Sequence, residues 1–247
     1  MPSFVRIFAA SVVTLSFGFV AGPVHSAIVV TQLNGVGGGE STIGNELAYL
    51  ASASDLINQG SPTFSPPQVV SGYTPFTLGG GSGTTTTDAM NNGVIGASND
   101  LSSIAFDLDG VWSSTFNLNT TLNPAGYDVT RIQTISGWSD NRTNQQYQVL
   151  YSRVGDGGVF TSLGNFFYRP NSGTDNSTRL TLDIAGLTQV AAIEFVFAVP
   201  DGGTASVYRE ADVFGSASVR ASAVPEPASL GAFAAGTLLV LRRRYAA

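Results

Sequence analysis

The chain has 247 residues, of which 29 are glycine, none is cysteine and only 11% are charged, whereas 43% are hydrophobic. The hydrophobic content can fill a core, which argues against disorder, and the absence of cysteine excludes disulfide bonds. Few charges together with abundant Thr, Val and Phe favour short strands and many turns over helices. The length allows one large all-β domain or two small ones, and the composition favours one.

The N-terminus has the features of a secretory signal peptide. Arg6 supplies the positive charge, Ile7–Val20 is an apolar run, and small residues allow cleavage after Ser26 or Ala27. An uncleaved membrane anchor is the alternative, although the apolar run is shorter than the ~20 residues that span a bilayer. The sequence therefore predicts export, with residues 1–26 removed.

Removal of this peptide would also remove His25, the only histidine, and would leave a chain without His, Cys or Lys. Such a chain has no Ser–His or Cys–His nucleophile, no lysine Schiff base and no His- or Cys-ligated zinc. Between Ala27 and Ala223, seven Arg stand against sixteen Asp and Glu, a net charge of 7 − 16 = −9. Nucleic acid is therefore not expected as a partner.

The first part of the exported chain has weaker patterns. Ile28–Val30 predicts a short strand. Apolar residues recur at helical spacing within Glu40–Asn58, which allows a short helix there. Ser61–Gly83 is rich in Pro, Gly, Ser and Thr, which predicts a long surface loop or an edge segment.

Strand patterns become regular from Ile104 onward. Apolar side chains alternate with polar ones in short runs, separated by turns rich in Gly, Asn and Asp. The alternating apolar residues are Ile104, Phe106 and Leu108; Phe116 and Leu118; Leu180, Leu182 and Ile184; Ile193, Phe195 and Phe197. Short strands at this spacing without intervening helices predict one antiparallel β-sandwich, which we assign to residues 27–215.

The best-specified stretch is Gly126–Arg153, which predicts a strand, a polar loop and a second strand. The loop brings together Trp138, Asp140, Arg142 and Asn144. A sugar ring has an apolar face that could stack on the indole and a rim of hydroxyls that could bond the three polar side chains. The loop is therefore a candidate glycan-binding site.

A structural interpretation of the same residues stays open. Trp138 could fill the core at the end of its strand, with Arg142 paired to Asp140. A second aromatic and cationic group, Phe166–Arg169, is better explained by a core strand. Three further acids, Asp107, Asp109 and Asp212, alternate with core positions and are expected on solvated faces.

The body from about Phe76 to Gly215 resembles the discoidin or galactose-binding-like jelly-roll sandwich of coagulation-factor C domains and bacterial carbohydrate-binding modules. The resemblance is carried by Tyr127–Ile135 with Gly137 and Trp138, by Tyr147–Ser152 and by Tyr208–Gly215. It implies a non-catalytic jelly roll that binds carbohydrate. The galactose binders of this family often use a histidine, and the exported chain has none.

The same resemblance implies a structural calcium ion. Glu210 matches a position that contributes to such a site in related modules, and Asp88 with Asn91 lies in the region that supplies loop oxygens. Calcium takes six to eight oxygen ligands, and secreted modules often hold it weakly. The alternative role for Glu210 is a salt bridge to a neighbouring Arg, and no other cofactor is expected.

The C-terminal segment, residues 224–247, follows a small-residue linker at 216–223. It consists of Pro225, Glu226 and Pro227, a 14-residue apolar run and the basic triplet Arg242, Arg243 and Arg244. The run would be about 21 Å long as a helix, short of the roughly 30 Å of a bilayer core. This order resembles the PEP-CTERM sorting signal. The resemblance implies transient anchoring in the inner membrane, processing by an exosortase-type protease and delivery to the cell surface or extracellular matrix.

Three functions remain open at this point. The first is an exported, non-catalytic sandwich that binds glycan or exopolysaccharide. The second is a purely structural matrix protein without a ligand. The third is a glycoside hydrolase, which would need two acids about 5–9 Å apart in a cleft, and no stretch pairs acids in a recognisable site.

Overall fold

The computed structural model describes residues 27–34, 51–77, 84–95, 101, 104–108, 110–138, 140–170, 176–200 and 205–219. In these ranges the chain is all-β, with antiparallel strand pairs and two short 3-10 helices, η3 (Thr87–Asn91) and η5 (Asp140–Thr143). This confirms the all-β prediction. No helix in the described ranges has the length and hydropathy to cross a bilayer. The predicted signal peptide and sorting segment lie outside these ranges.

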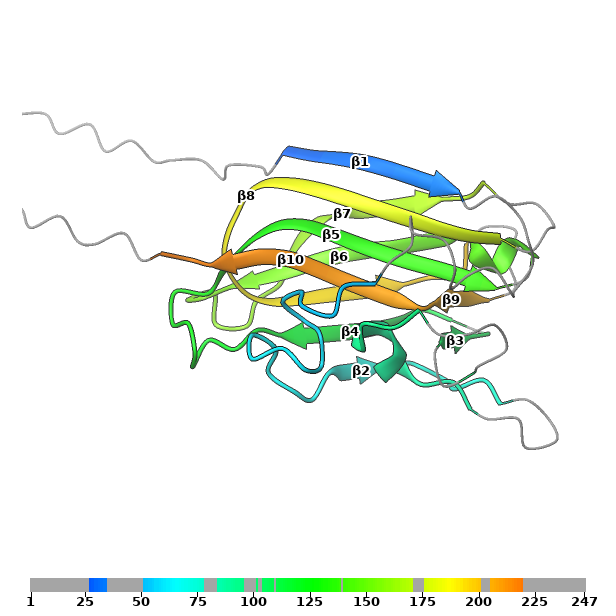
Figure 1. The fold of residues 1–247 in the computed structure, drawn as a ribbon, viewed down its shortest axis with the longest axis horizontal. Coiled ribbons are helices and arrows are strands. Elements are labelled where there is room, and N and C mark those ends of the chain that lie inside the picture. The colour runs from blue at the N-terminus through cyan, green and yellow to red at the C-terminus, as the bar shows by residue number, and fades with distance from the viewer. Residues whose placement is uncertain are drawn as a thin grey trace, which may run out of the picture.

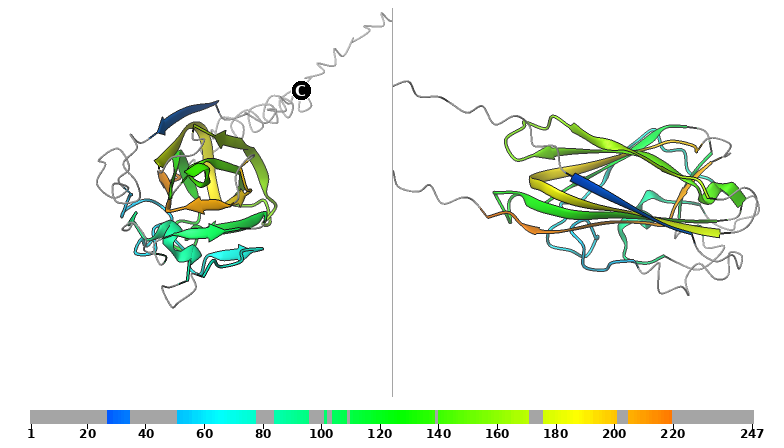
Figure 2. Two further views of the ribbon diagram at one scale, coloured as in Figure 1. Left: turned by 90° about the vertical axis from the view of Figure 1, so that its right-hand side faces the viewer. Right: turned by 90° about the horizontal axis from the view of Figure 1, so that it is seen from above.

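Eight strands form one continuous sheet that folds into two layers around a core (Figures 1 and 2). The first layer contains β1 (Ala27–Asn34), the first half of β8 (Asn176–Phe197), β5 (Tyr127–Trp138) and β10 (Glu210–Ala217). The second layer contains β7 (Thr161–Tyr168), β6 (Gln145–Arg153), the second half of β8, β4 (Trp112–Asn117) and β2 (Val69–Ser71). A small separate sheet pairs β3 (Ala105–Asp107) with β9 (Ser206–Tyr208).

Strand β8 belongs to both layers because it bends in the middle. It pairs with β1 up to Ala185, and with β4 and β6 from about Val190 onward. At the bend, Gly186 has φ +82° and Gln189 has φ +60°. Positive φ costs glycine little, which explains Gly186 at this turn. Figure 1 shows the yellow ribbon turning back at the end of the sandwich where β10 finishes.

The core lies between the layers and follows the alternation seen in the sequence. In β4 and β6 every second side chain is buried over most of the strand, as a sheet with one solvated face requires. Leu180 and Leu182 from the first layer belong to the same cluster as Phe195 and Phe197 from the second. Burying one such side chain stabilises the fold by about 1.5–3 kcal/mol.

Two local predictions are corrected by the structure. The described part of the possible helix, residues 51–58, forms bends and turns, and it is held to β10 by a bond from Leu56 N to Val213 O of 2.7 Å. Asp107 and Asp212 are buried and not solvated, with 1% and 0% exposed. Protein donors replace water as hydrogen-bond partners of these carboxylates. For example, the backbone N–H of Thr74 donates to Asp107 Oδ2 at 2.7 Å. Asp109 lies outside the described ranges.

We predict that Gly215→Ala destabilises the fold. A Cβ at this position would lie 2.2 Å from the carbonyl oxygen of Asp128, at the β10–β5 register shift between Phe214 and Gly215. The backbone must shift to relieve this contact, which should lower the free energy of unfolding by about 1–3 kcal/mol. The control is Gly110→Ala, whose Cβ would meet no atom within 4 Å. Urea denaturation measures both, and equal midpoints would contradict the prediction.

Candidate functional site

Trp138 is the last residue of β5, and its side chain lies in a second hydrophobic cluster rather than on the surface. It is 7% exposed, and its ring centroid is 5.7 Å from that of Phe106. Ile104 and Val207 belong to the same cluster. The cluster sits over the small β3–β9 sheet, so the indole closes one end of the sandwich. A ring in this position offers almost no face to a sugar.

The other residues of the predicted loop site differ in their exposure, since Asn144 is buried and Arg142 is half-buried. Asn144 is 3% exposed, and the Arg142 guanidinium carbon is 6.0 Å from the centroid of the Phe106 ring. Asp140 begins η5, and its side chain is not among those described. The burial of Trp138 matches its interpretation as a core residue, whereas the pairing of Arg142 with Asp140 stays a prediction. Binding by the four residues remains a prediction that would require the loop to open.

Trp138→Ala should therefore act on stability. Removing a large buried aromatic leaves a cavity and should cost about 3–5 kcal/mol of unfolding free energy. Phe167→Ala is the matched control because that ring is 63% exposed, and truncation there should change stability by less than about 0.5 kcal/mol. Thermal denaturation compares the two variants. An unshifted melting curve for Trp138→Ala would contradict the core role and favour a surface role for this residue.

Glu210 begins β10 with its side chain in the interior. It is 0% exposed, and neither carboxylate oxygen has a hydrogen-bond partner at normal geometry, although the backbone amides of Gly93 and Val94 lie close enough to lower its pKa. Asp212 and Asp55 are close enough to raise its pKa. Asp212 is better satisfied, because Ser52 N donates to one oxygen at 3.0 Å and Gln133 Nε2 to the other at 2.9 Å.

These three carboxyls have elevated pKa values. Burial, and then the charges of Asp212 and Asp55, raise the pKa of Glu210 to about 10, and the amides of Gly93 and Val94 lower it only in part. Burial raises the pKa of Asp212 to about 7 and that of Asp55 to about 6. Near neutral pH Glu210 is therefore protonated, Asp212 is about half protonated and Asp55 is mostly ionised, unless a cation joins the group.

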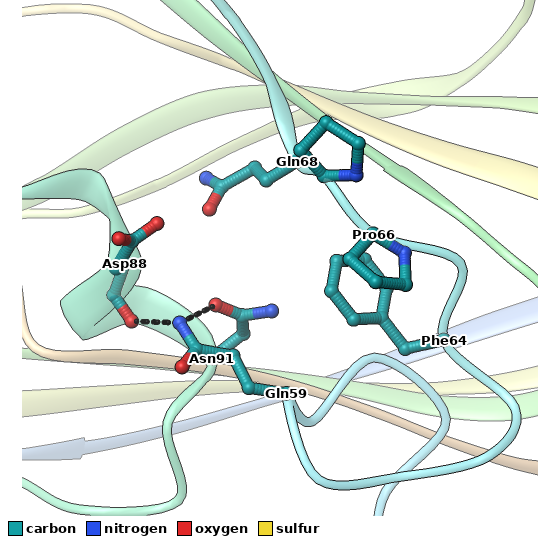
Figure 3. A pocket seen from close by; sticks show the side chains of 7 residues that line it. Gln59, Phe64, Pro66, Gln68, Asp88 and Asn91 are labelled. Carbon is teal, nitrogen blue, oxygen red and sulfur yellow. Dashed lines mark hydrogen bonds between the residues drawn. The ribbon is translucent and has the colours of Figure 1, made fainter.

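The fit of this group to calcium is partial. The unbonded oxygens of Glu210 are available as hard ligands. However, no three His, Cys, Asp or Glu side chains among the described residues are arranged to hold a metal ion. Carbonyl oxygens and water would have to complete the shell. Asp88 is not among the groups that shift the pKa of Glu210, and it lines a separate pocket (Figure 3).

The carboxyl group predicts a specific pH dependence of stability in chelator. Because the folded state retains protons that the unfolded state releases above about pH 4, the melting temperature should fall as pH rises. The steepest fall should lie between about pH 5 and pH 7, where Asp55 and Asp212 titrate in the folded state, and only Glu210 extends it further. Differential scanning calorimetry across this range measures the effect.

Calcium should oppose that fall. A ligand that binds only the folded state stabilises it by about 2.7 kcal/mol at a hundred times its Kd. Glu210→Gln keeps the shape and removes the titrating group, so it should make the fall shallower, chiefly above about pH 7 where only Glu210 still holds its proton, and it should abolish the calcium effect. Asp88→Asn should leave both unchanged, because its side chain faces the other pocket. Equal melting temperatures in chelator and in millimolar calcium at pH 8 would count against the site.

The second layer carries an aromatic surface on its outer side. Phe167 on β7 is 63% exposed, whereas Phe166 beside it is 8% exposed. Gln146 pairs with Phe167 across the strands, and Gln148 pairs with Asn165. Phe167, Gln146, Gln148 and Asn165 therefore share this surface, which we call the Phe167 face together with Arg169.

Arg169 is positioned over this surface by two contacts. Its guanidinium carbon is 5.4 Å from the centroid of the Phe167 ring, and its Nη2 donates to Gln146 Oε1 at 2.5 Å. The surface lines a hollow of about 320 Å³ whose apolar wall includes Val111 and Val196. The sequence interpretation placed both phenylalanines in the core. The period of two in β7 makes this correct for Phe166 and wrong for Phe167.

The chain matches no protein-family model and no curated protein. Among solved structures it is similar to CpGH89CBM32-5 from Clostridium perfringens in complex with GalNAc-β-1,3-galactose, at a TM-score of 0.40 and 17% identity, over 60% of this chain and 94% of that one. It is also similar to the C-terminal domain of a chitobiase from Bacteroides fragilis (TM-score 0.42, 16% identity, 62% and 95% covered). It is also similar to a pectin-binding carbohydrate-binding module, at a TM-score of 0.36 and 12% identity, over 65% of this chain and 94% of that one. Similarities at this level transfer neither fold nor function to this chain.

Proposed function

We propose that this protein is an exported, non-catalytic β-sandwich that binds polysaccharide through the Phe167 face. The observation that carries the proposal is the 63% exposure of Phe167 beside three amides and a guanidinium. An exposed ring costs solvation free energy unless something covers it, and a pyranose covers a ring with its C–H face while its hydroxyls meet the amides. A jelly-roll connectivity and a place among galactose-binding-like modules are part of the same proposal.

The proposed absence of catalysis is supported by where three clustered carboxylates lie. A glycoside hydrolase needs two acids on either side of a bond in a solvent-accessible cleft. The clustered acids Asp55, Glu210 and Asp212 are 3%, 0% and 0% exposed, so a glycan cannot reach them. The Phe167 face has amides and a guanidinium, which bind hydroxyls and carboxylates but do not transfer protons near neutral pH.

The structural-spacer alternative and the binding proposal predict different results for one variant. Phe167→Ala should weaken retention of the protein in gels containing its polysaccharide by about 1–3 kcal/mol of binding free energy, as for an exposed aromatic anchor. The melting curve should not shift. The panel should contain neutral β-glucan and galactan as well as acidic pectin and alginate, because Arg169 could also bind a uronate.

Leu122→Ala provides the matched control, since this leucine is 58% exposed and lies outside the Phe167 face. It should leave gel retention unchanged. Failure of the unmodified protein to be retained by any polysaccharide would favour the spacer. Equal retention of the protein and its Phe167→Ala variant would place binding elsewhere.

Export and surface sorting complete the proposal, and they are supported by the sequence patterns at 1–26 and 224–247. In this proposal an exosortase-type protease acts near Pro225–Pro227, and the apolar run and Arg triplet hold the protein at the inner membrane until then. The matrix polysaccharide would be the partner of the released protein.

This sorting proposal predicts two new chain ends. Mass spectrometry of the surface-associated protein should find a mature N-terminus at Ala27 or Ile28 and no peptides after about Pro227. The peptide that contains Arg179 serves as the internal control for recovery. An intact C-terminal peptide in the surface fraction would exclude the processing step.

A further inference from the structure

A second pocket lies at the β2 edge of the sandwich, away from the Phe167 face. It has a volume of about 280 Å³ and is formed by the chain before β2 and by η3. Its lining residues are Gln59, Phe64, Pro66, Pro67, Gln68, Asp88 and Asn91. Figure 3 shows Asp88 and the Gln68 amide on one side of the hollow and Phe64 with Pro66 on the other. Polar and apolar groups are thus segregated across it.

The hydrogen bonds within the pocket use its donors and leave acceptors. Gln59 Nε2 donates to Asp88 O at 2.9 Å and to Asn91 Oδ1 at 3.2 Å, so both of its hydrogens are engaged. Asn91 Nδ2 donates to Ile57 O at 2.8 Å, and Gln68 Nε2 donates to Ser114 Oγ. Four of the six amide hydrogens of these three side chains are therefore engaged within the protein.

The remaining polar atoms accept hydrogen bonds. Gln68 Oε1 is buried and receives no hydrogen bond. Asp88 is exposed, and its carboxylate contributes two further acceptor oxygens to the pocket lining. An unsatisfied buried acceptor is unfavourable, so a ligand that supplies a donor to Gln68 removes a cost already present in the free protein.

We propose that this pocket binds a single amino sugar through its protonated amine. The ammonium group would lie against Asp88, hydroxyls would donate to Gln68, and the C–H face of the ring would lie on Pro66 and Pro67, which are exposed whereas Phe64 is buried. A volume of about 280 Å³ is just below the roughly 300–1,000 Å³ of drug-sized ligand pockets, which suits one ring and not a chain.

The charge of the protein agrees with this ligand class. The chain has a net charge of −6 and contains no lysine, so no side-chain amine of its own competes for the pocket. An acidic protein attracts a cationic ligand over the distance of the Debye length. The inference goes beyond polysaccharide binding by the Phe167 face, because the two sites share no lining residue.

The test is a titration of the full-length protein, solubilised and labelled with ¹⁵N, with four probes observed by NMR: glucosamine, N-acetylglucosamine, glucose and propylammonium. Glucosamine should shift the amide signals of Gln59, Gln68 and Asp88. N-acetylglucosamine and glucose should bind at least about tenfold more weakly, because they lack the charge-assisted hydrogen bond. Propylammonium should also bind more weakly, because it lacks the ring and the hydroxyls.

Asp88→Asn should reduce the affinity for glucosamine about tenfold, whereas Asp156→Asn, at an exposed turn, should not change it. Equal binding of glucose would overturn the role of the amine, and equal binding of propylammonium would overturn the sugar. If glucosamine causes no shift in the amide signals of the pocket residues, the proposed site is wrong.

Phe167→Ala should bind glucosamine normally, and Asp88→Asn should be retained normally in polysaccharide gels, so the failure of one proposal is separable from that of the other.

Discussion

The structure depends on the hydrogen bonding of one long strand to four others. The first half of β8 pairs with β1 and β5, and the second half pairs with β4 and β6. The bend near Gly186 carries Leu182 into one layer and Phe195 into the other, so both sides of the core belong to the same segment. Because β6 takes its register from β8, and β7 takes its register from β6, this strand also determines which side chains face solvent on the second layer.

Two groups break the usual rule that apolar side chains lie inside and charged ones outside. Phe167 is exposed on a regular strand, whereas Glu210 is fully buried without a hydrogen bond. Each is unfavourable in the isolated fold, and each becomes favourable if a partner of suitable chemistry is added. Conflicts of this kind in an otherwise consistent sequence are expected at functional positions. They lie in different layers, which separates a surface suited to binding from an interior group suited to stabilisation.

The sequence was sufficient for the class of fold but not for the sites. Alternation in the run Ile193–Phe197 predicts a strand with one buried face, and burial confirms it, whereas in Leu180–Ile184 the intervening Thr181 is buried as well. Alternation does not say which face meets the core when both faces carry large residues, as in Phe166–Tyr168. Trp138 and Asp212 depend on contacts with distant segments, the β3–β9 sheet and Ser52, which no local pattern contains. The acceptor-rich pocket likewise joins residues near 60 and 90 that only the fold brings together.

The direction of β10 has a mechanical consequence. β1 begins and β10 ends at the same end of the sandwich (Figure 1), and β10 is hydrogen-bonded along its length to β5. A pull on the chain beyond Ala217, with the second layer held in place, acts parallel to these strands. The β10–β5 bonds then resist in shear and must yield together, whereas a perpendicular pull would open them one at a time. The β10–β5 pairing therefore resists a pull along the strands more strongly than a pull across them.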